Sequence, residues 1–171
     1  LVVARQLAMR GGSPEILLFA DPGLMKGDAL ANWEIIRKLG LKVEVLSTTA
    51  DARSLLRKTP APDIVVDALF GTGLAKPLGR EFRSAVDWVN RAGSHALVVS
   101  VDIPSGLVAD SASIPGPAVK AHLTVTFTAL KMAHVMPPAA DLAGKVIVAP
   151  IGSPQSLLEN PENRTSLIDA A

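Results

Sequence analysis

Short runs of apolar, often β-branched residues alternate along the chain with longer segments of mixed polarity that end at glycine or before proline. The runs predict strands and the longer segments predict helices. We expect strands at 15–20, 41–46, 63–69, 96–101, 122–128 and 145–150. We expect helices from the first residue to Gly11–Gly12 and at 27–39, 50–58 and 80–92.

This alternation of strands and helices predicts a mostly parallel sheet. Strands that are apolar throughout are typical of parallel sheets, because helices cover both faces of such sheets. No helix is predicted between the last two strands, so we expect that edge of the sheet to depart from the simple strand–helix–strand pattern.

The two ends of the chain and one long loop differ from the alternating pattern. No capping residue precedes the first helix, so we infer that the chain begins partway through a larger protein. Residues 1–152 are expected to form one domain, and the polar residues 153–171 a tail or linker. The loop at 108–119 is rich in proline and small residues, and we expect it to be exposed.

Composition excludes several classes of partner. Of the 171 residues, 49% are hydrophobic and 19% charged, as in folded proteins. The net charge of +1, with 4% aromatic residues and no tyrosine, predicts no binding to nucleic acid or to an acidic membrane. Cysteine is absent, which favours a reducing compartment and a cytoplasmic protein. No apolar run reaches the roughly 18 residues of a membrane-spanning helix.

Two aspartates stand where predicted strands end. Asp67 closes the apolar part of DIVVDALFGTG, and Asp102 follows LVVSV. They are about one strand–helix–strand unit apart, so the two strands are expected to be neighbours and the two carboxylates to line one crevice. Each aspartate could instead serve only as a turn residue or a helix cap.

The glycine turn after Asp67 is a candidate anion site. Gly71 and Gly73 permit positive φ and close approach of a ligand, and successive N–H groups could form a nest for an anion. Lys76 and Arg80 add positive charge. Lys76 stands where a dinucleotide fingerprint needs glycine, so that fingerprint is absent.

The remaining candidates for chemistry carry weaker signals. No nucleophile motif surrounds Ser105. Lys131 follows a predicted strand and could face the same crevice, although we expect it to be solvated. The three histidines have no metal-ligand spacing and are expected to be structural or exposed: His95, His122 and His134.

Three segments together resemble a known family. DALFGTGL (67–74), VDIPSGL (101–107) and TVTFTALK (124–131), in this order and spacing, resemble the YjeF N-terminal domain family, the NAD(P)H-hydrate epimerases. The resemblance extends to about residue 150. It implies a three-layer α/β/α Rossmann-like sandwich with a mostly parallel sheet, often dimeric.

The resemblance implies an isomerase of nicotinamide nucleotide repair. Members interconvert the R and S epimers of hydrated NADH and NADPH, so that a fused or separate dehydratase can act on the whole pool. By motif matching, Asp67 and Ser105 would be ligands of a potassium ion. Asp102 would contact the substrate and is our candidate catalytic residue. The other substrate-binding residues would be Gly71, Thr72, Gly73, Leu74, Ala75, Lys76 and Pro77.

The chain departs from the family pattern at its beginning. The family's Asn-Asn-Gly-Gly-Asp-Gly loop, the strand before it and the N-terminal helices do not occur in this sequence. That loop contributes phosphate contacts and one potassium ligand. The alternative hypothesis is therefore a non-catalytic binding or dimerisation module with the same fold.

Overall fold

The computed structural model describes residues 1–46 and 62–160, together with positions 52, 54, 59, 162 and 166. The chain divides into two compact units. Unit 1 contains residues 1–60 and 79–85, and unit 2 contains residues 61–78 and 86–171. Apart from positions 52 and 54, which are helical, the helix expected at 50–58 lies outside the described residues.

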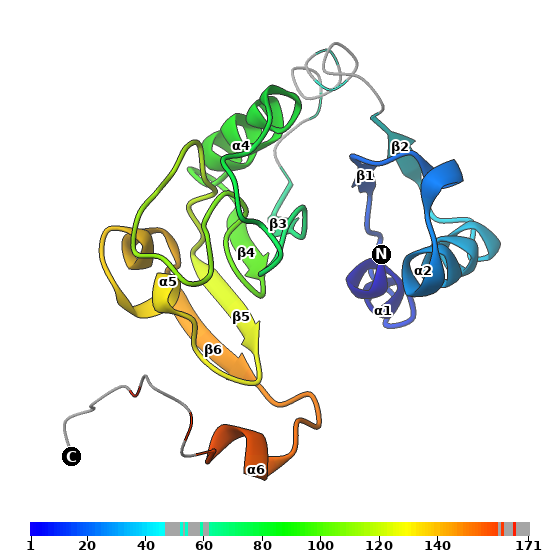
Figure 1. Ribbon diagram of the computed structural model, residues 1–171. Helices are drawn as coiled ribbons and strands as arrows, with labels where there is room; N and C mark the ends of the chain where they lie inside the picture. The colour runs from blue at the N-terminus through cyan, green and yellow to red at the C-terminus, as the bar shows by residue number, and fades with distance from the viewer. Residues whose placement is uncertain are drawn as a thin grey trace. The chain divides into compact units, whose positions relative to one another are not determined.

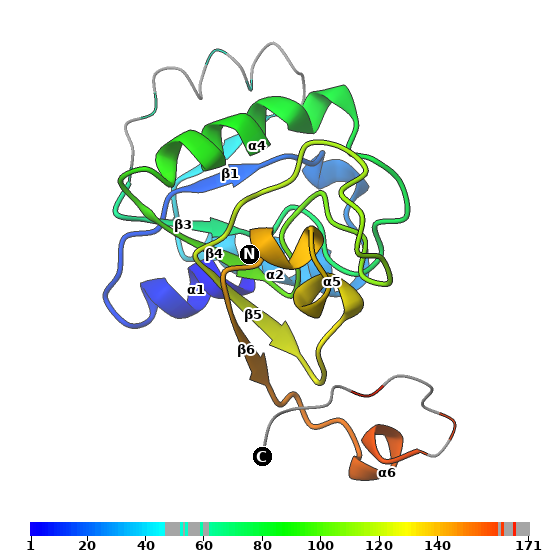
Figure 2. The ribbon, with the colours of Figure 1, turned by 90° about the vertical axis from the view of Figure 1, so that its left-hand side faces the viewer.

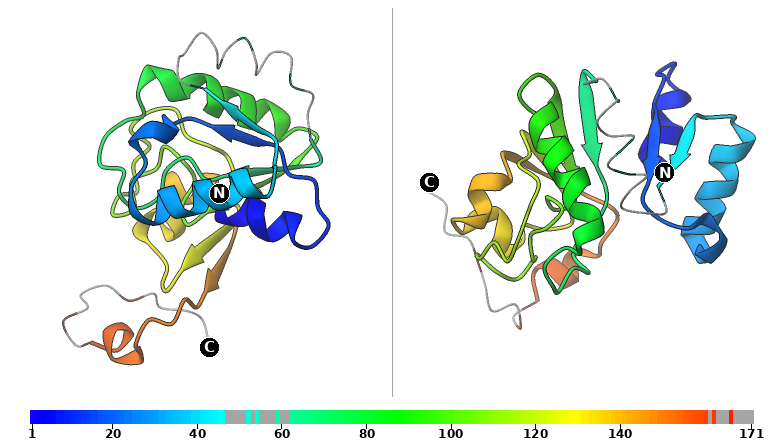
Figure 3. Two further views of the ribbon diagram at one scale, coloured as in Figure 1. Left: turned by 90° about the vertical axis from the view of Figure 1, so that its right-hand side faces the viewer. Right: turned by 90° about the horizontal axis from the view of Figure 1, so that it is seen from above.

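Unit 1 contains a small parallel sheet and two helices. Strand β1 (Ile16–Leu18) pairs in parallel with β2 (Val43–Val45). Helix α1 (Val2–Ala8) lies beside α2 (Gly27–Lys38), and the short η1 (Pro22–Leu24) precedes α2 (Figures 1 and 3). Gly40 has φ +64° directly after the C-cap of α2, as its predicted place requires.

Unit 2 is built on a four-stranded parallel sheet in the order β3-β4-β5-β6 (Figure 1). The strands are β3 (Ile64–Asp67), β4 (Leu97–Val101), β5 (Leu123–Phe127) and β6 (Lys145–Ala149), and all neighbouring pairs are parallel. The predicted strands, their parallel sheet and the pairing of β3 with β4 are therefore confirmed.

The expectation that the last edge departs from the pattern was wrong. Helix α5 (Met132–Val135) and η2 (Ala139–Leu142) lie between β5 and β6, which pair in parallel. Four-residue elements are too short to produce a helical hydrophobic period, so the sequence pattern did not show them.

Helix α4 (Arg80–Ala92) supplies one wall of the core of unit 2. Its buried Val86 and Val89 belong to one apolar cluster with Val65 of β3 and Val98 of β4. Helix α4 begins and ends at the predicted residues.

The loop at 108–119 is less exposed than its composition predicted. Ala109 and Ala118 are buried in a second apolar cluster with Ala133 of α5, and Val119 is fully buried. Small side chains let this loop pack closely. At Gly106, where φ is +106°, a Cβ atom would lie 2.4 Å from the carbonyl oxygen of Pro117. The expectation of an exposed loop holds only for its middle part.

The region after β6 is exposed where it is described. Helix α6 (Gln155–Leu158) has no buried residue and follows the end of β6 (Figures 1 and 2). A domain boundary near residue 152 stays a prediction. Among the described residues, no helix combines the length and the apolar character needed to cross a membrane.

Candidate functional site

Asp67 ends β3 inside the core of unit 2. Asp67 is 2% exposed, and in the register of β3 and β4 it stands opposite Ser100. The Ser100 hydroxyl donates to Asp67 Oδ2 at 2.8 Å, and the Ser105 hydroxyl donates to Oδ1 at 2.6 Å. Backbone N–H groups of Ser105 and Leu69 add bonds at 2.9 and 3.5 Å. Among the described residues, every hydrogen bond to this carboxylate comes from a neutral group.

The electrostatics of Asp67 follow from these neutral partners. Burial raises the pKa of Asp67, and the hydrogen bonds from Ser105, Ser100 and Leu69 offset only part of that effect. A buried carboxylate of this kind favours a nearby positive charge.

The oxygen atoms around Asp67 fit a hard monovalent cation. Asp67 and Ser105 supply carboxylate and hydroxyl oxygens. The Phe70 carbonyl oxygen lies 3.4 Å from Ser105 Oγ, while the Phe70 N–H donates to the same hydroxyl at 3.0 Å. Oxygen ligands and one negative charge suit such an ion. Among the described residues, no group of three His, Cys, Asp or Glu side chains could hold a metal.

Asp102 follows β4 in a strained backbone conformation. Its φ is +68°, and the N–H of Ile103 donates to the carbonyl oxygen of Val101 at 2.9 Å. This bond closes a γ-turn centred on Asp102, and such a turn with positive φ is rare. The N–H of Asp102 donates to Val125 of β5 at 2.7 Å. The turn thus projects the Asp102 side chain from the end of the sheet.

The neighbouring strand ends in the same way. Thr128 follows β5 with φ +68°, and the N–H of Ala129 donates to the carbonyl oxygen of Phe127 at 2.7 Å. The Thr128 hydroxyl pairs with the Ser153 hydroxyl at 2.7 Å. Each strained residue of this kind costs about 1–3 kcal/mol, and such residues gather at functional sites. Two of them on adjacent strands mark this edge of the sheet as the candidate site.

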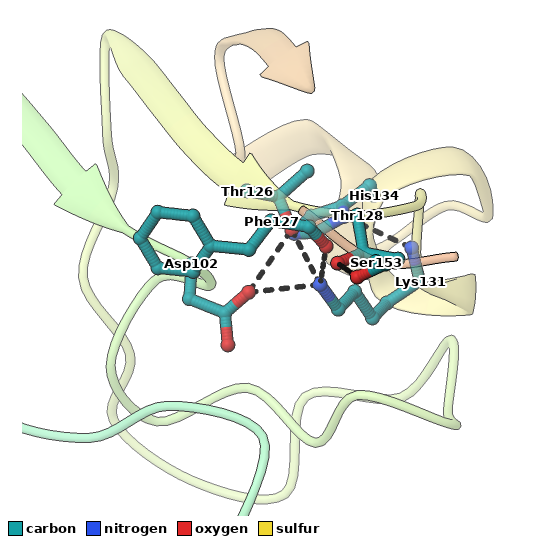
Figure 4. Close-up of polar contacts among 7 residues, drawn as sticks. All are labelled: Asp102, Thr126, Phe127, Thr128, Lys131, His134 and Ser153. Atoms are coloured by element: carbon teal, nitrogen blue, oxygen red, sulfur yellow. Dashed lines mark hydrogen bonds and ion pairs between the residues drawn. The ribbon is translucent and has the colours of Figure 1, made fainter. Parts of the chain in front are cut away.

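Lys131 forms an ion pair with Asp102 (Figure 4). Lys131 Nζ lies 2.8 Å from Asp102 Oδ1, and the two side chains are only 18% and 16% exposed. Nζ also donates to Thr126 Oγ1 at 2.7 Å and to the carbonyl oxygen of Phe127 at 2.9 Å. The Thr126 hydroxyl donates to Asp102 Oδ1 at 3.0 Å. The prediction that Lys131 is a solvated lysine was wrong.

The charge of Asp102 is stabilised. Burial acts to raise the pKa of Asp102, but the hydrogen bonds from Lys131 and Thr126 and the positive charge of Lys131 together lower it. Asp102 is therefore a carboxylate at neutral pH, and it lies next to an ammonium group. A proton acceptor and a proton donor stand side by side.

The glycine turn begins next to this pair. A Cβ atom on Gly71 would lie 3.4 Å from Asp102 Oδ2, so the turn passes close to the carboxylate. Neither Gly71 nor Gly73 uses the positive φ that glycine permits, and an anion site in this turn stays a prediction. Thr72, Gly73, Ala75, Lys76 and Pro77 are exposed, and Leu74 is half-buried. Arg80 begins α4 and belongs to unit 1.

The histidines have the structural or exposed positions expected of them. His122 is exposed and accepts the N–H of Val98 through Nδ1 at 3.0 Å. His95 is exposed. His134 is buried in α5 and accepts the N–H of Lys131 through Nδ1 at 3.1 Å.

Three polar residues that contact Asp67 or Asp102 were not predicted from the sequence. Ser100 and Thr126 lie inside strands, where a hydroxyl gives no signal of its own. Lys131 could face the crevice by its place after a strand, but a lysine at such a place is usually solvated. An alternation of threonines along β5 (Thr124 and Thr126 are both 0% exposed) could have indicated polar partners at this depth.

The fold and this site define a class: a parallel α/β protein with two carboxylate centres at the carboxyl ends of adjacent strands, where ligands of such folds bind. Comparison with known proteins places the chain within that class. The model of the family described as YjeF-related protein N-terminus matches residues 1–133, and the chain belongs to this family.

Several relatives carry names that describe their activity. The chain is 42% identical over 160 residues to the bifunctional NAD(P)H-hydrate repair enzyme Nnr of Thermofilum pendens, covering 94% of this chain and 30% of that protein. It is 35% identical to the NAD(P)H-hydrate epimerase of Rhodopirellula baltica, covering 91% and 62%. The epimerase of Pirellula staleyi is 33% identical, with 92% and 69% covered.

A solved structure has the same fold. The crystal structure of yeast ynu0, YNL200c, matches with a TM-score of 0.66 and 19% identity, over 87% of this chain and 58% of that one. The chain thus spans about a third of the bifunctional relatives and about two thirds of the epimerases.

Proposed function

We propose that the protein containing this chain is an NAD(P)H-hydrate epimerase. It would interconvert the R and S forms of hydrated NADH and NADPH, as the names of its relatives describe for them. The observation that carries the proposal is the ion pair of Asp102 and Lys131 at 2.8 Å, held at the end of β4 by a strained turn. A domain that serves only as a scaffold has no need of this arrangement.

The ion pair suits the chemistry of a hydrated nicotinamide ring. Its hydroxyl stands on the carbon next to the ring nitrogen. Inverting that carbon requires either the carbon–oxygen bond or the ring to open and close again. Both routes move a proton at or near the hydroxyl, and positioned acid–base groups accelerate such steps by about 10²–10⁴-fold. Asp102, kept ionised, would accept the hydroxyl proton, and Lys131 would donate one.

The buried Asp67 would have a supporting role. Together with Ser105 it would hold a potassium ion, whose charge would offset that of Asp67 and attract oxygen atoms of the substrate. The exposed turn Gly71–Pro77 would bind the nucleotide, because it begins at Asp102 and offers N–H groups and the ammonium group of Lys76.

The surroundings of the reaction follow from the relatives. Bifunctional relatives are named as repair enzymes, so we propose that a dehydratase, fused or separate, consumes the product. A homodimer, and a cytoplasmic location in keeping with the absence of cysteine, belong to the same proposal.

The test is an epimerisation assay on the full-length protein. One purified epimer of hydrated NADH is supplied, and the appearance of the other is followed chromatographically. We expect turnover by the unsubstituted protein. In Asp102→Asn we expect a fall of at least tenfold with ligand binding roughly retained, since asparagine hydrogen-bonds but is no base.

Asp110→Asn is the matched control, because Asp110 is an exposed aspartate of the same unit. Its rate should equal that of the unsubstituted protein. An Asp102→Asn variant that epimerises at the normal rate removes Asp102 from the mechanism. One that loses binding and rate together leaves it a positioning residue. A full-length protein that binds the hydrate without epimerising it would support the binding module instead.

A further inference from the structure

His134 is a buried imidazole one helical turn from the ion pair. It occupies the third position of α5 and is 6% exposed. The ring Nδ1 of His134 accepts the backbone N–H of Lys131 at 3.1 Å. The backbone N–H of His134 donates to the Lys131 carbonyl oxygen at 2.9 Å. The side chain thus acts as the glutamate of a capping box does, by accepting the N–H group that precedes the helix.

The hydrogen bond at Nδ1 identifies the tautomer of the imidazole ring. Since Nδ1 accepts a hydrogen bond, the proton of the neutral ring is on Nε2. Nε2 is buried and has no hydrogen-bond partner among the residues that the structure describes. Burial first, and then the charge of Lys131, lower the pKa of His134, although the Asp102 main chain and carboxylate act in the other direction. The ring therefore remains neutral.

The position of Lys131 depends on this contact. The ammonium group has three partners at 2.7–2.9 Å, and a shift of the Lys131 main chain would strain or lengthen these three bonds together. That main chain is the N-cap of α5, where extended backbone (φ −105°, ψ 160°) turns into helix. A four-residue helix has little stability of its own. The N–H of Lys131, at the N-cap, donates its hydrogen bond to His134 Nδ1 instead of to water.

We infer that His134 is a positioning residue for the epimerisation. By accepting the Lys131 N–H, it fixes the start of α5 and so places the ammonium group against Asp102. The inference rests on the proposed function, and it concerns a buried side chain that acts through Lys131.

The experiment compares two replacements at this position in the full-length protein. Asparagine can accept the Lys131 N–H from nearly the position of Nδ1, and leucine fills similar space without an acceptor. Because a displacement of about 1 Å can cost about 10²-fold in rate, we expect His134→Leu to lower kcat by at least about tenfold. KM should stay within about twofold, since substrate binding is not removed. His134→Asn should restore most of kcat.

His122 provides the control. It also accepts a backbone N–H through Nδ1, but from Val98, at the start of β4. His122→Leu removes the same kind of bond away from Lys131, so its kcat should be unchanged. A loss of kcat in His122→Leu as large as in His134→Leu would mean a general effect on folding and would overturn the inference. Equal rates in His134→Leu and the unsubstituted protein, or equal losses in the leucine and asparagine variants, would also overturn it.

A spectroscopic measurement is independent of activity. The ¹⁵N spectrum of histidine-labelled, unsubstituted protein should show His134 at neutral pH as the tautomer protonated on Nε2. A tautomer protonated on Nδ1 would overturn the inference even if the variants failed to fold. If the tautomer is as expected but the unsubstituted protein does not epimerise, then the proposed function fails while the contact itself stands.

Discussion

Asp67 and Asp102 end neighbouring strands of one sheet, and their surroundings differ. Asp67 receives hydrogen bonds from two serine hydroxyls and two backbone N–H groups, and burial raises its pKa. Asp102 faces the ammonium group of Lys131, which contributes to a lowered pKa. The charge of a carboxylate with neutral partners is not compensated, whereas that of a carboxylate in an ion pair is compensated by the cationic side chain. Under the proposed function, the first would hold a cation and the second would accept and release protons.

The largest expected effect is on the rate, at the paired centre. Lys131→Met removes the ammonium group but keeps most of the apolar stem. We expect epimerisation by the full-length protein to fall by about 10²-fold, as for the loss of a positioned proton donor. Lys131→Arg should not restore the rate, because a planar guanidinium cannot reproduce the three bonds of the ammonium group. Steady-state kinetics would measure both variants, and a fully active Lys131→Met would show that the two centres do not differ in this way.

The next effect is on stability, at the centre with neutral partners. Asp67→Ala leaves the donors of Ser100 and Ser105 without their acceptor inside the core. Such buried, unsatisfied groups cost about 1–3 kcal/mol. Urea denaturation at neutral pH should show this loss. Asp110→Asn, at an exposed position, should show none. An unchanged unfolding free energy in Asp67→Ala would mean that these hydrogen bonds do no more than offset the cost of burying the charge of Asp67.

A smaller effect distinguishes the two centres by their response to potassium. At a potassium concentration of about five times the dissociation constant, binding adds about 1 kcal/mol of stability. For a domain of this size that corresponds to a Tm increase of about 2–4 °C. We expect this increase in the full-length protein and in Asp102→Asn, but not in Asp67→Asn. Choline chloride at equal ionic strength is the control, and a shift that survives in Asp67→Asn would place the ion elsewhere.

The smallest effect is the dependence of stability on pH, with opposite signs at the two centres. Because the pKa of Asp102 is lowered below its ordinary value of 3.8, its ionised form stabilises the fold above that pH, and the contribution disappears as the pH falls through the lowered pKa. Because the pKa of Asp67 is raised, its ionised form costs stability, and the cost develops as the pH rises from 3.8 through the raised pKa.

Urea denaturation at a series of pH values, without potassium, would measure this difference. Asp102→Asn should lessen the acid-side loss of stability, and Asp67→Asn should lessen the decline as the pH rises from 3.8. Parallel changes in the two variants would contradict the opposite signs.

The aspartates themselves could be predicted because their signal is local. In DIVVD and LVVSVD an apolar run meets a carboxylate before a turn, and strands one helix apart pair in parallel. The same local logic located α4 and the end of α2 at Gly40. The two turn glycines, by contrast, permit a positive φ that neither adopts, because glycine allows that conformation without requiring it.

Which partner each aspartate has was decided only by the tertiary structure. Lys131 lies 29 residues after Asp102 and meets it because β5 pairs with β4 and the start of α5 turns the lysine back toward the sheet. The hydrophobic periodicity of the sequence does not indicate a contact between residues so far apart in the chain. The sequence by itself determined that two carboxylates stand at adjacent strand ends. The packing of α5 and the registers of β3, β4 and β5 decided that one is paired with a cationic side chain, whereas the other has neutral partners among the residues that the structure describes. Charge pairing depends on distance in space and not on separation along the chain.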